Sequence, residues 1–307
     1  MKKLFSFGLA TILALSLAAC GSPSNGDVQK PSGVSTDAPS GTQSQMPDMN
    51  VEESQMPEGG GVSIPESVLV DESGVKITAT GFDTKAMFGP ELKLLIENNS
   101  GQDLTFQSRG ASVNGYMVET MMSVDVVTGK KANGGLSLSS SDLKLCGIDT
   151  IADLEFSFHI FTSEGWETYL DTPPVQLKTS AADTYEYTFD DSGDLAYEGN
   201  GIKILIKGLD EDSSILGPGI VVYLENSSDA SITVQARDTS VNGFMLSPVF
   251  SSEVVGGKHA VDTITFMSSE LEENNITSID TVELSFHIFE TEGWDTIVDT
   301  DAVTITF

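Results

Sequence analysis

The sequence is short of the residues that build disulfide frameworks, metal centres and common catalytic sites. It contains two cysteines and three histidines, and its only arginines are Arg109 and Arg237. A zinc site needs three or four nitrogen or sulfur ligands, and no two histidines stand at ligand spacing. The Gly-x-Ser-x-Gly, His-Glu-x-x-His and P-loop motifs are all absent. We therefore expect no enzymatic activity; a carboxylate pair serving a hydrolase of glycan or cell-wall material is a minor alternative.

Basic side chains are also scarce. The chain has 15 Lys and Arg against 46 Asp and Glu, which gives a formal net charge of −31 at pH 7. A surface this acidic argues against binding to nucleic acid and to anionic lipid headgroups. It is typical of a soluble, self-repelling surface protein; the alternative is a surface that binds cations or a basic partner.

The start of the chain has the features of a secretory signal. Met1-Lys2-Lys3 is basic, residues 4–19 are largely apolar, and the segment is too short to span a bilayer. It ends in Leu17-Ala18-Ala19-Cys20-Gly21, which resembles a bacterial lipobox. The resemblance implies that residues 1–19 are removed and that Cys20 carries lipid, which anchors the chain to a membrane of the cell envelope. The protein would then face the exterior or the periplasm.

The next segment, residues 20–65, is rich in Ser, Gly, Pro, Gln and Asp and has too few apolar side chains to form a core. We interpret it as a disordered tether. With Cys20 lipidated, Cys146 has no partner for a disulfide within the chain. We expect Cys146 to be a small, half-buried hydrophobic residue rather than a nucleophile.

Most of the remaining sequence is one segment written twice. Residues 89–172 recur as residues 217–300 without a gap. This period is that of a whole small domain and is too long for a solenoid repeat. We therefore expect two like domains, domain 1 at residues 66–179 and domain 2 at residues 194–307, joined by a connector at residues 180–193.

Both domains have the pattern of β-proteins. Residues 154–160 alternate between apolar and polar side chains, and so do residues 282–288, as in an antiparallel strand buried on one face. Asn114-Gly115 and Asn242-Gly243 predict hairpin turns. Strand and turn signals recur through each repeat, and no long helical period is present. The sequence predicts an all-β protein of two tandem immunoglobulin-like antiparallel β-sandwiches, each with one short helix.

Local signals predict some further elements. Ser139–Lys144 and Ser268–Glu273 each fit a helix that begins with a serine cap and has an acid in its first turn. Trp166–Leu170 and Trp294–Val298 are expected to be strands that follow a Glu-Gly turn. In the connector, aromatic residues alternate from position 185 to position 189, which suggests a strand-like segment.

Three motifs occur in both repeats. They are Ser-Val-Asn-Gly-(Tyr/Phe)-Met at 112–117 and 240–245, Val-Val-x-Gly-Lys-x-Ala at 126–132 and 254–260, and Phe-His-Ile-Phe-x-x-Glu-Gly-Trp-x-Thr at 158–168 and 286–296. Together they resemble the immunoglobulin-like domains of unknown function in surface lipoproteins of Gram-positive bacteria and, more distantly, domains of mycobacterial immunogenic secreted antigens. The resemblance implies an immunoglobulin-like sandwich on the cell surface and carries no catalytic residues.

Four residues at equivalent positions are candidates for ligand binding. Arg109 and Arg237 suit bidentate pairing with a carboxylate of a ligand; a structural role, bridging a loop carboxylate or backbone carbonyls, is the alternative. Trp166 and Trp294 are the only tryptophans. Since buried aromatic residues dominate sandwich cores, we expect both to pack in the core; the alternative is an exposed platform on which a sugar stacks.

Acidic residues recur near each tryptophan and are candidate calcium ligands. Oxygen ligands in a loop suit Ca²⁺, but the EF-hand pattern is absent, and solvated acidic loops are the alternative. The candidates are Glu164, Glu167 and Asp171 in domain 1 and Glu292, Asp295 and Asp299 in domain 2. No other cofactor is expected.

The lipobox, the duplication and the lack of a catalytic constellation favour one function. We expect a lipid-anchored extracellular binding or structural module that presents two similar faces. Its partner would be an extracellular protein, peptide or glycan, in addition to the membrane that it reaches through its lipid. The alternative is a calcium-responsive surface rod, in which Ca²⁺ stiffens the two domains.

Overall fold

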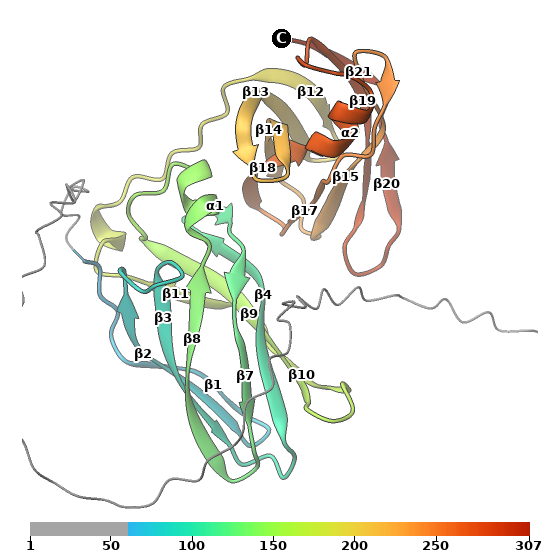
Figure 1. The fold of residues 1–307 in the computed structure, drawn as a ribbon. Coiled ribbons are helices and arrows are strands. Elements are labelled where there is room, and N and C mark those ends of the chain that lie inside the picture. Colours follow the sequence, from blue (N-terminus) through green and yellow to red (C-terminus); the bar gives the residue numbers. More distant parts are fainter. Residues whose placement is uncertain (1–60) are drawn as a thin grey trace, which may run out of the picture. The chain divides into compact units, whose positions relative to one another are not determined.

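The computed structural model describes residues 61–307, whose regular structure is almost entirely β-sheet (Figure 1). Cys20, the signal segment 1–19 and residues 20–60 of the tether lie outside the described residues. No helix in the described part of the chain is long and apolar enough to cross a membrane. The chain forms two tandem immunoglobulin-like antiparallel β-sandwiches, each with one short helix, as the sequence predicted.

Domain 1 consists of two sheets that share one hydrophobic core. The first sheet contains, in spatial order, β1 (Ser67–Glu72), β2 (Val75–Asp83), β3 (Glu91–Asn98), β8 (Lys130–Leu138) and β6 (Thr120–Met121). The second contains β10 (Thr168–Asp171), β9 (Asp153–Thr162), β4 (Leu104–Val113) and β5 (Tyr116–Met117), with β7 (Ser123–Val126) paired to β4 and β11 (Val175–Lys178) paired to β9. Helix α1 (Ser140–Leu145) follows β8.

Domain 2 repeats this plan around a second core. Its first sheet contains β12 (Asp194–Gly199), β13 (Ile202–Ser214), β14 (Gly217–Asn226) and β18 (Lys258–Thr265). Its second sheet contains β16 (Phe244–Met245), β15 (Ile232–Val241), β19 (Thr281–Glu290) and β20 (Thr296–Asp299), with β17 (Ser251–Val254) paired to β15 and β21 (Val303–Thr306) paired to β19. Helix α2 (Ser268–Glu273) follows β18.

The alternating pattern of the sequence positions the long strand of each second sheet. In β9 the apolar residues Leu154, Phe156, Phe158 and Ile160 point inward, and each is at most 1% exposed. Their neighbours in sequence therefore lie on the outer face of the sheet, because side chains alternate across a strand. The equivalent strand β19 has the same arrangement.

The predicted Asn-Gly hairpin turns are confirmed. Asn114 and Gly115 have φ angles of 52° and 85°, and Asn242 and Gly243 have φ angles of 50° and 85°. Positive φ at both central residues is typical of the type I′ turn. The side chain of Asn114 also accepts hydrogen bonds from the backbone N–H groups of Ala152 and Asp153 and donates one to the carbonyl of Thr150.

The two predicted helices occur, but only one has its predicted cap. The Ser139 hydroxyl accepts a hydrogen bond from the Asp142 N–H at 3.3 Å and caps α1. In α2 the N-cap is Met267, which makes no side-chain hydrogen bond. The prediction of a serine cap is wrong there because Ser268 already lies inside the helix.

The connector is not strand-like. It contains a short 3-10 helix, Ala182–Thr184, and no strand from residue 185 to residue 193. Its aromatic residues contact side chains of the two domains instead of pairing in a ladder. The Tyr187 hydroxyl donates to the carboxylate of Asp153, and the ring of Phe189 packs on Tyr116 with centroids 5.2 Å apart.

One bridge joins the sheets of the two domains. β5 pairs in parallel with β18 at Tyr116 and His259, and the His259 N–H donates to the Gly115 carbonyl at 3.0 Å. The strands β10-β9-β4-β5-β18-β14-β13-β12 therefore form one hydrogen-bonded path through both domains.

Candidate functional site

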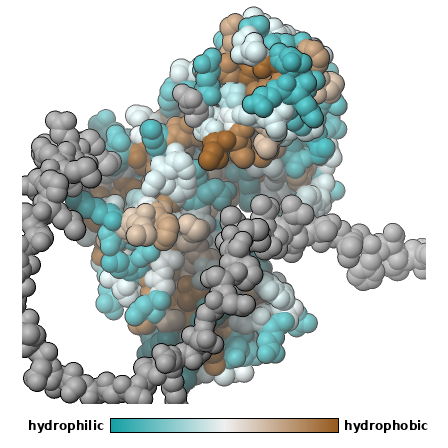
Figure 2. All heavy atoms as spheres, viewed as in Figure 1, coloured by the Kyte–Doolittle hydropathy of each residue, from teal (hydrophilic) through white to brown (hydrophobic). Residues whose placement is uncertain are grey.

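Large apolar side chains reach the surface at several separate places. The face of the molecule in Figure 2 carries small hydrophobic patches among hydrophilic residues. The two tryptophans belong to the exposed set: Trp166 is 75% exposed and Trp294 is 74% exposed. The expectation that they pack in the cores is therefore wrong. Both stand at equivalent hairpins, Trp166 between β9 and β10 and Trp294 between β19 and β20.

The hairpin turn itself holds each indole outside. The backbone N–H of Trp166 donates to the Thr162 carbonyl at 3.0 Å, and the backbone N–H of Trp294 donates to the Glu290 carbonyl at 2.9 Å. The predicted strands occur, but they begin two residues later than predicted, at Thr168 and Thr296, so the tryptophans lie in the turns.

The backbone of both tryptophans is strained. Their φ angles are 57° and 59°, in the left-handed region that glycine or asparagine usually occupies. For a bulky side chain this conformation costs about 1–2 kcal/mol. The same strained residue at the same turn in both domains indicates that the side chain is retained for what it contacts.

Each indole rests on a buried phenylalanine. Trp166 stacks on Phe161 with ring centroids 5.4 Å apart and planes inclined by 17°, and Trp294 stacks on Phe289 at 5.5 Å and 14°. Phe161 and Phe289 are 4% and 5% exposed. The phenylalanine thus supports the indole from beneath, and most of the indole surface remains open to a ligand.

A histidine and an aspartate continue each stack. The rings of His159 and Phe161 lie 5.2 Å apart, and Nδ1 of His159 is 2.5 Å from a carboxylate oxygen of Asp171. In domain 2 the corresponding distance between His287 and Asp299 is 2.6 Å. A carboxylate at one ring nitrogen fixes the orientation of the imidazole.

The strand register brings these residues and the candidate arginines onto one surface. Residues opposite each other in an antiparallel pair share a face. In domain 1, Thr105 lies opposite Phe161, Gln107 lies opposite His159 and Ser123, and Arg109 lies opposite Ser157. We call this surface the outer face of domain 1: Thr105, Gln107, Arg109, Ser123, Ser157, His159, Phe161, Trp166 and Asp171.

Domain 2 has the same surface with the same residues. The outer face of domain 2 consists of Thr233, Gln235, Arg237, Ser251, Ser285, His287, Phe289, Trp294 and Asp299. Each of these nine residues is identical to its counterpart in domain 1, whereas Asp125, opposite Thr105 on the same face, is replaced by Glu253. On the inward side of the same strands, Leu104, Phe106, Leu154 and Phe156 are replaced by Ile232, Val234, Val282 and Leu284, while Phe158 and Ile160 recur as Phe286 and Ile288. Packing tolerates apolar exchanges at inward positions, whereas none of the nine residues of the outer face differs between the domains.

The arginines lie at the opposite end of the face from the tryptophans. Both arginines are exposed, and Arg237 donates to the Gln235 side chain at 2.6 Å. Arg109 lies four residues along β4 from Thr105, the residue that is paired with Phe161. At the rise of a β-strand, this separation is about 13 Å. Sequence reasoning treated the arginines and tryptophans separately and missed the Gln, His and Phe between them. The sequence did contain a signal for these residues. The period-two pattern places His159 on the polar face of its strand, and Gln107, His159 and Phe161 each have an identical counterpart in domain 2.

The acidic candidates do not assemble into metal sites. Within residues 61–307, no group of three or more His, Cys, Asp or Glu side chains is arranged to hold a metal ion. Asp171 and Asp299 are bonded to the histidines. The other four candidates, Glu164, Glu167, Glu292 and Asp295, are exposed in the hairpin turns.

The contact between the domains, which we call the junction, is built around His259. Its Nδ1 lies 2.6 Å from the Tyr223 hydroxyl, and its ring stacks on Phe189 with centroids 3.8 Å apart. Burial lowers the pKa of His259. Lys258 adds an ion pair to Glu155 of domain 1 at 3.1 Å.

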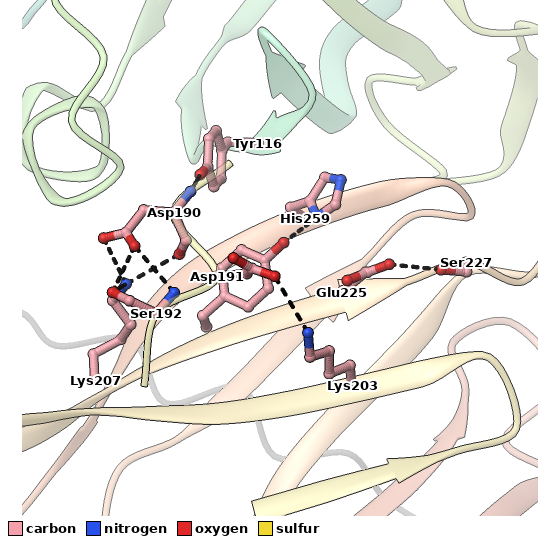
Figure 3. A network of polar contacts seen from close by, with 10 residues as sticks. Tyr116, Asp190, Asp191, Ser192, Lys203, Lys207, Glu225, Ser227 and His259 are labelled. Carbon is pink, nitrogen blue, oxygen red and sulfur yellow. Dashed lines mark hydrogen bonds and ion pairs between the residues drawn. The ribbon is translucent and has the colours of Figure 1, made fainter. Parts of the chain in front are cut away.

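The connector is fastened to both domains beside the junction, as Figure 3 shows. The Asp190 N–H donates to the Tyr116 hydroxyl, and the Asp190 carboxylate pairs with Lys207 at 2.7 Å. Hydrogen bonds from Lys207 and Ser192 hold the pKa of Asp190 well below its usual range. Asp191 pairs with Lys203 at 3.4 Å.

Cys146 has the environment that the sequence predicted. It is half-buried and packs against the core of domain 1. Burial raises the pKa of its thiol to about 12, so the reactive thiolate is scarce at neutral pH.

No family model and no curated protein matches this chain. Among solved structures, the YadV chaperone is 10% identical, with 76% of this chain and 100% of that chain covered and a TM-score of 0.23. A chain of the Salmonella enterica SafA pilin complex with the SafB chaperone is 9% identical, with coverages of 78% and 98% and a TM-score of 0.20. The CupB2 chaperone of Pseudomonas aeruginosa is 12% identical, with coverages of 70% and 90% and a TM-score of 0.18. These TM-scores are too low to bear on ligand, partner or activity.

Proposed function

We propose that this protein is a lipid-anchored extracellular binding module whose two outer faces each bind a glycan. The observation that carries the proposal is the recurrence of all nine residues of the outer face, with an exposed tryptophan on a supporting phenylalanine in each domain, while several buried positions of the same strands differ. A protein that needs only stability has no reason to keep an exposed tryptophan in a strained backbone twice. The proposal includes no catalytic activity.

The chemistry of the face favours a sugar over other ligands. An exposed indole supported by a second ring offers a flat apolar surface for the ring face of a pyranose. Beyond it lie planar polar groups, including Gln107, His159 and Arg109, which donate and accept hydrogen bonds as sugar hydroxyls require. Both faces are open, which suits an extended ligand better than a compact apolar molecule.

A shallow hollow adjoins the outer face of domain 1. Its volume is about 460 Å³, and its lining includes Gln107 and Ser123 of the face together with Ser108, Thr120 and Met121. Polar side chains supply much of this lining, so water or hydroxyl groups fit there better than an apolar group. The hollow gives substituents of a bound sugar room beside the central row of the face.

The location of the module rests on the N-terminal sequence. Lipid on Cys20 and a tether at residues 20–65 would hold the faces away from a membrane, as in the Gram-positive surface lipoproteins that the motifs resemble. The test is the Cys20→Ser variant of the full chain, expressed in a bacterium that processes lipoproteins. We expect wild type in the membrane fraction and the variant outside it. Equal membrane association of both would contradict lipid anchoring.

Binding is tested with the full chain on a broad array of immobilised glycans. We expect retention on a subset of pyranose polymers, and loss of retention in the double variant Trp166→Ala/Trp294→Ala. Each exposed aromatic anchor is worth about 2 kcal/mol, or roughly 30-fold in affinity. The matched control is Phe88→Ala, which removes an exposed aromatic side chain from the β2–β3 loop, away from both faces. Retention that survives in the double variant would overturn the proposal.

A further inference from the structure

The two outer faces meet where the domains meet. A Cβ atom placed on Gly110, beside Arg109, would lie 3.3 Å from a side-chain carbon of Val255. Two residues before Val255 is Glu253, whose pKa is raised by burial and by Glu119 and lowered by the charge of Arg109. The arginine end of the first face is therefore next to Glu253 of domain 2.

Glu253 lies beside the tryptophan end of the second face, at the position that Asp125 occupies in domain 1. It lies opposite Thr233 in the β15–β17 pair, and Thr233 lies opposite Phe289 in the β15–β19 pair. Phe289 supports Trp294. The first face thus ends at Arg109 where the second face begins at Glu253 and Trp294, so the two faces follow one another head to tail.

The junction keeps the two faces in this order. It combines the strand bridge between Tyr116 and His259, the stack of Phe189 on His259 and the ion pair between Lys258 and Glu155. The aromatic centre of the junction is not repeated: His259 corresponds to Lys131 and Tyr223 corresponds to Leu95, whereas Lys258 and Glu155 recur as Lys130 and Glu283. The contacts of His259 are therefore specific to the boundary between the two domains.

Two identical faces placed head to tail match a ligand that repeats itself in one direction. A polysaccharide chain has this property, because each sugar is joined to the next through the same linkage with the same polarity. The ring faces that lie flat on an indole belong to pyranoses whose substituents are equatorial. A chain of such sugars presents one flat face after another along its length.

We propose that the two outer faces form one continuous binding track for a single polysaccharide chain of β-1,4-linked pyranoses, long enough to lie on Trp166 and Trp294 at once. This inference rests on the proposed glycan-binding function. When one ligand engages both faces, the second contact is intramolecular, and its effective concentration raises the affinity by about 100-fold without any new kind of contact.

The test is a length series measured by calorimetry on the full chain. The probes are cello-oligosaccharides and chito-oligosaccharides from the disaccharide to the octasaccharide, two series that share the β-1,4 linkage and differ in their N-acetyl groups. We expect weak binding of the short probes to two equivalent sites. At a threshold length, we expect a rise of about 100-fold in affinity and a change to one ligand per chain. The series that shows this rise identifies the type of sugar.

Single variants separate the track from two independent sites. Trp166→Ala and Trp294→Ala should each abolish the rise with length while the remaining site still binds the short probes. His259→Lys, which places the domain 1 residue in the junction, should weaken the rise and leave short-probe binding unchanged. Equal affinity at all lengths, with each tryptophan variant merely losing one of two sites, would overturn the track and leave glycan binding intact. Absence of binding to every probe and every arrayed glycan would overturn both proposals.

Discussion

The ring of Phe189 stacks on the imidazole of His259 with centroids 3.8 Å apart. One residue comes from the connector and the other from β18, so a single contact ties the connector to the strand that joins the two sheets. Tyr223, a residue that is 1% exposed, places its hydroxyl 2.6 Å from Nδ1 of His259 and so fixes the orientation of the imidazole. His259 is therefore the side chain on which the order of the two domains most depends.

Replacing this histidine should loosen the junction. The variant His259→Lys loses an aromatic stack worth about 1 kcal/mol and a hydrogen bond worth about 1 kcal/mol. We expect the free energy of unfolding to fall by about 2 kcal/mol, measured by urea denaturation. The matched control is Lys131→His, which makes the reciprocal change at an exposed ion pair with Glu97 and should alter stability by less than about 1 kcal/mol. Equal effects of the two changes would contradict the role of His259.

The carboxyl group of Asp262 should make stability depend on pH. Burial raises the pKa of this group, and the nearby charge of Asp142 raises it further. Hydrogen bonds from Thr263 and Ser252 lower the pKa but do not offset the effect of burial. The folded state thus binds this proton more tightly than the unfolded state, and the contribution to stability falls as pH rises above the unfolded value of about 4. Asp262→Asn cannot ionise, so we expect it to gain stability relative to wild type between pH 4 and pH 7. Urea denaturation at both pH values measures this gain, and a stability difference that does not change with pH would contradict it.

Binding and stability should separate at Trp166. Trp166→Gly loses the stack on Phe161, worth about 1 kcal/mol, and relieves a left-handed backbone that costs a similar amount. We expect the melting temperature to change by less than about 4 °C while glycan binding at that face is lost. The contrasting variant Phe158→Ala, in the core, should cost about 3–5 kcal/mol. A large fall in the melting temperature of Trp166→Gly would show that the indole serves the fold.

The buried amide of Asn114 should be essential for the hairpin that carries β5. It makes three hydrogen bonds, to Thr150, Ala152 and Asp153, and has a φ of 52°. Asn114→Gly keeps access to this backbone conformation and loses the bonds, so it should cost about 3 kcal/mol. Asn114→Ala should cost about 1 kcal/mol more, because alanine also resists positive φ. Equal stability of the two variants in urea would show that the backbone conformation contributes nothing.

Cys146 should resist alkylation in the folded protein. Its pKa of about 12 leaves a small fraction of thiolate at pH 8, and the side chain packs against the core. We expect labelling by iodoacetamide, followed by mass spectrometry, to be slow in buffer and fast in concentrated urea. Rapid labelling in buffer would indicate that the packing around α1 opens readily.

Local patterns predicted the parts of the fold that depend on local physics. Period-two alternation at residues 154–160 identified β9 and its buried side, because one face of a strand meets the core. Asn114-Gly115 identified a hairpin, because few residues tolerate positive φ. The alternation of the connector misled, since the contacts of Tyr187 and Phe189 are with distant side chains and not with a neighbouring strand.

The candidate site was predicted in pieces. Arg109 and Trp166 were each identified from their rarity and their repetition, but nothing in their sequence positions places them on one face. Their relation depends on the pairing of β4 with β9, which sets Arg109 opposite Ser157 and Thr105 opposite Phe161. Trp166 is exposed because it lies in a turn with positive φ, a conformation that bulky residues disfavour. The usual burial of tryptophan therefore led to the prediction that Trp166 lies in the core.

The sequence by itself determined the duplication, the all-β class and the acidic charge, because each is a property of composition or of spacing along the chain. Tertiary structure alone decided that nine repeated residues form one outer face in each domain. It also decided that the arginine end of the first face adjoins domain 2, where Gly110 faces Val255. The physical reason is that register and domain contact join residues far apart in sequence, through hydrogen bonds and packing that no local pattern encodes.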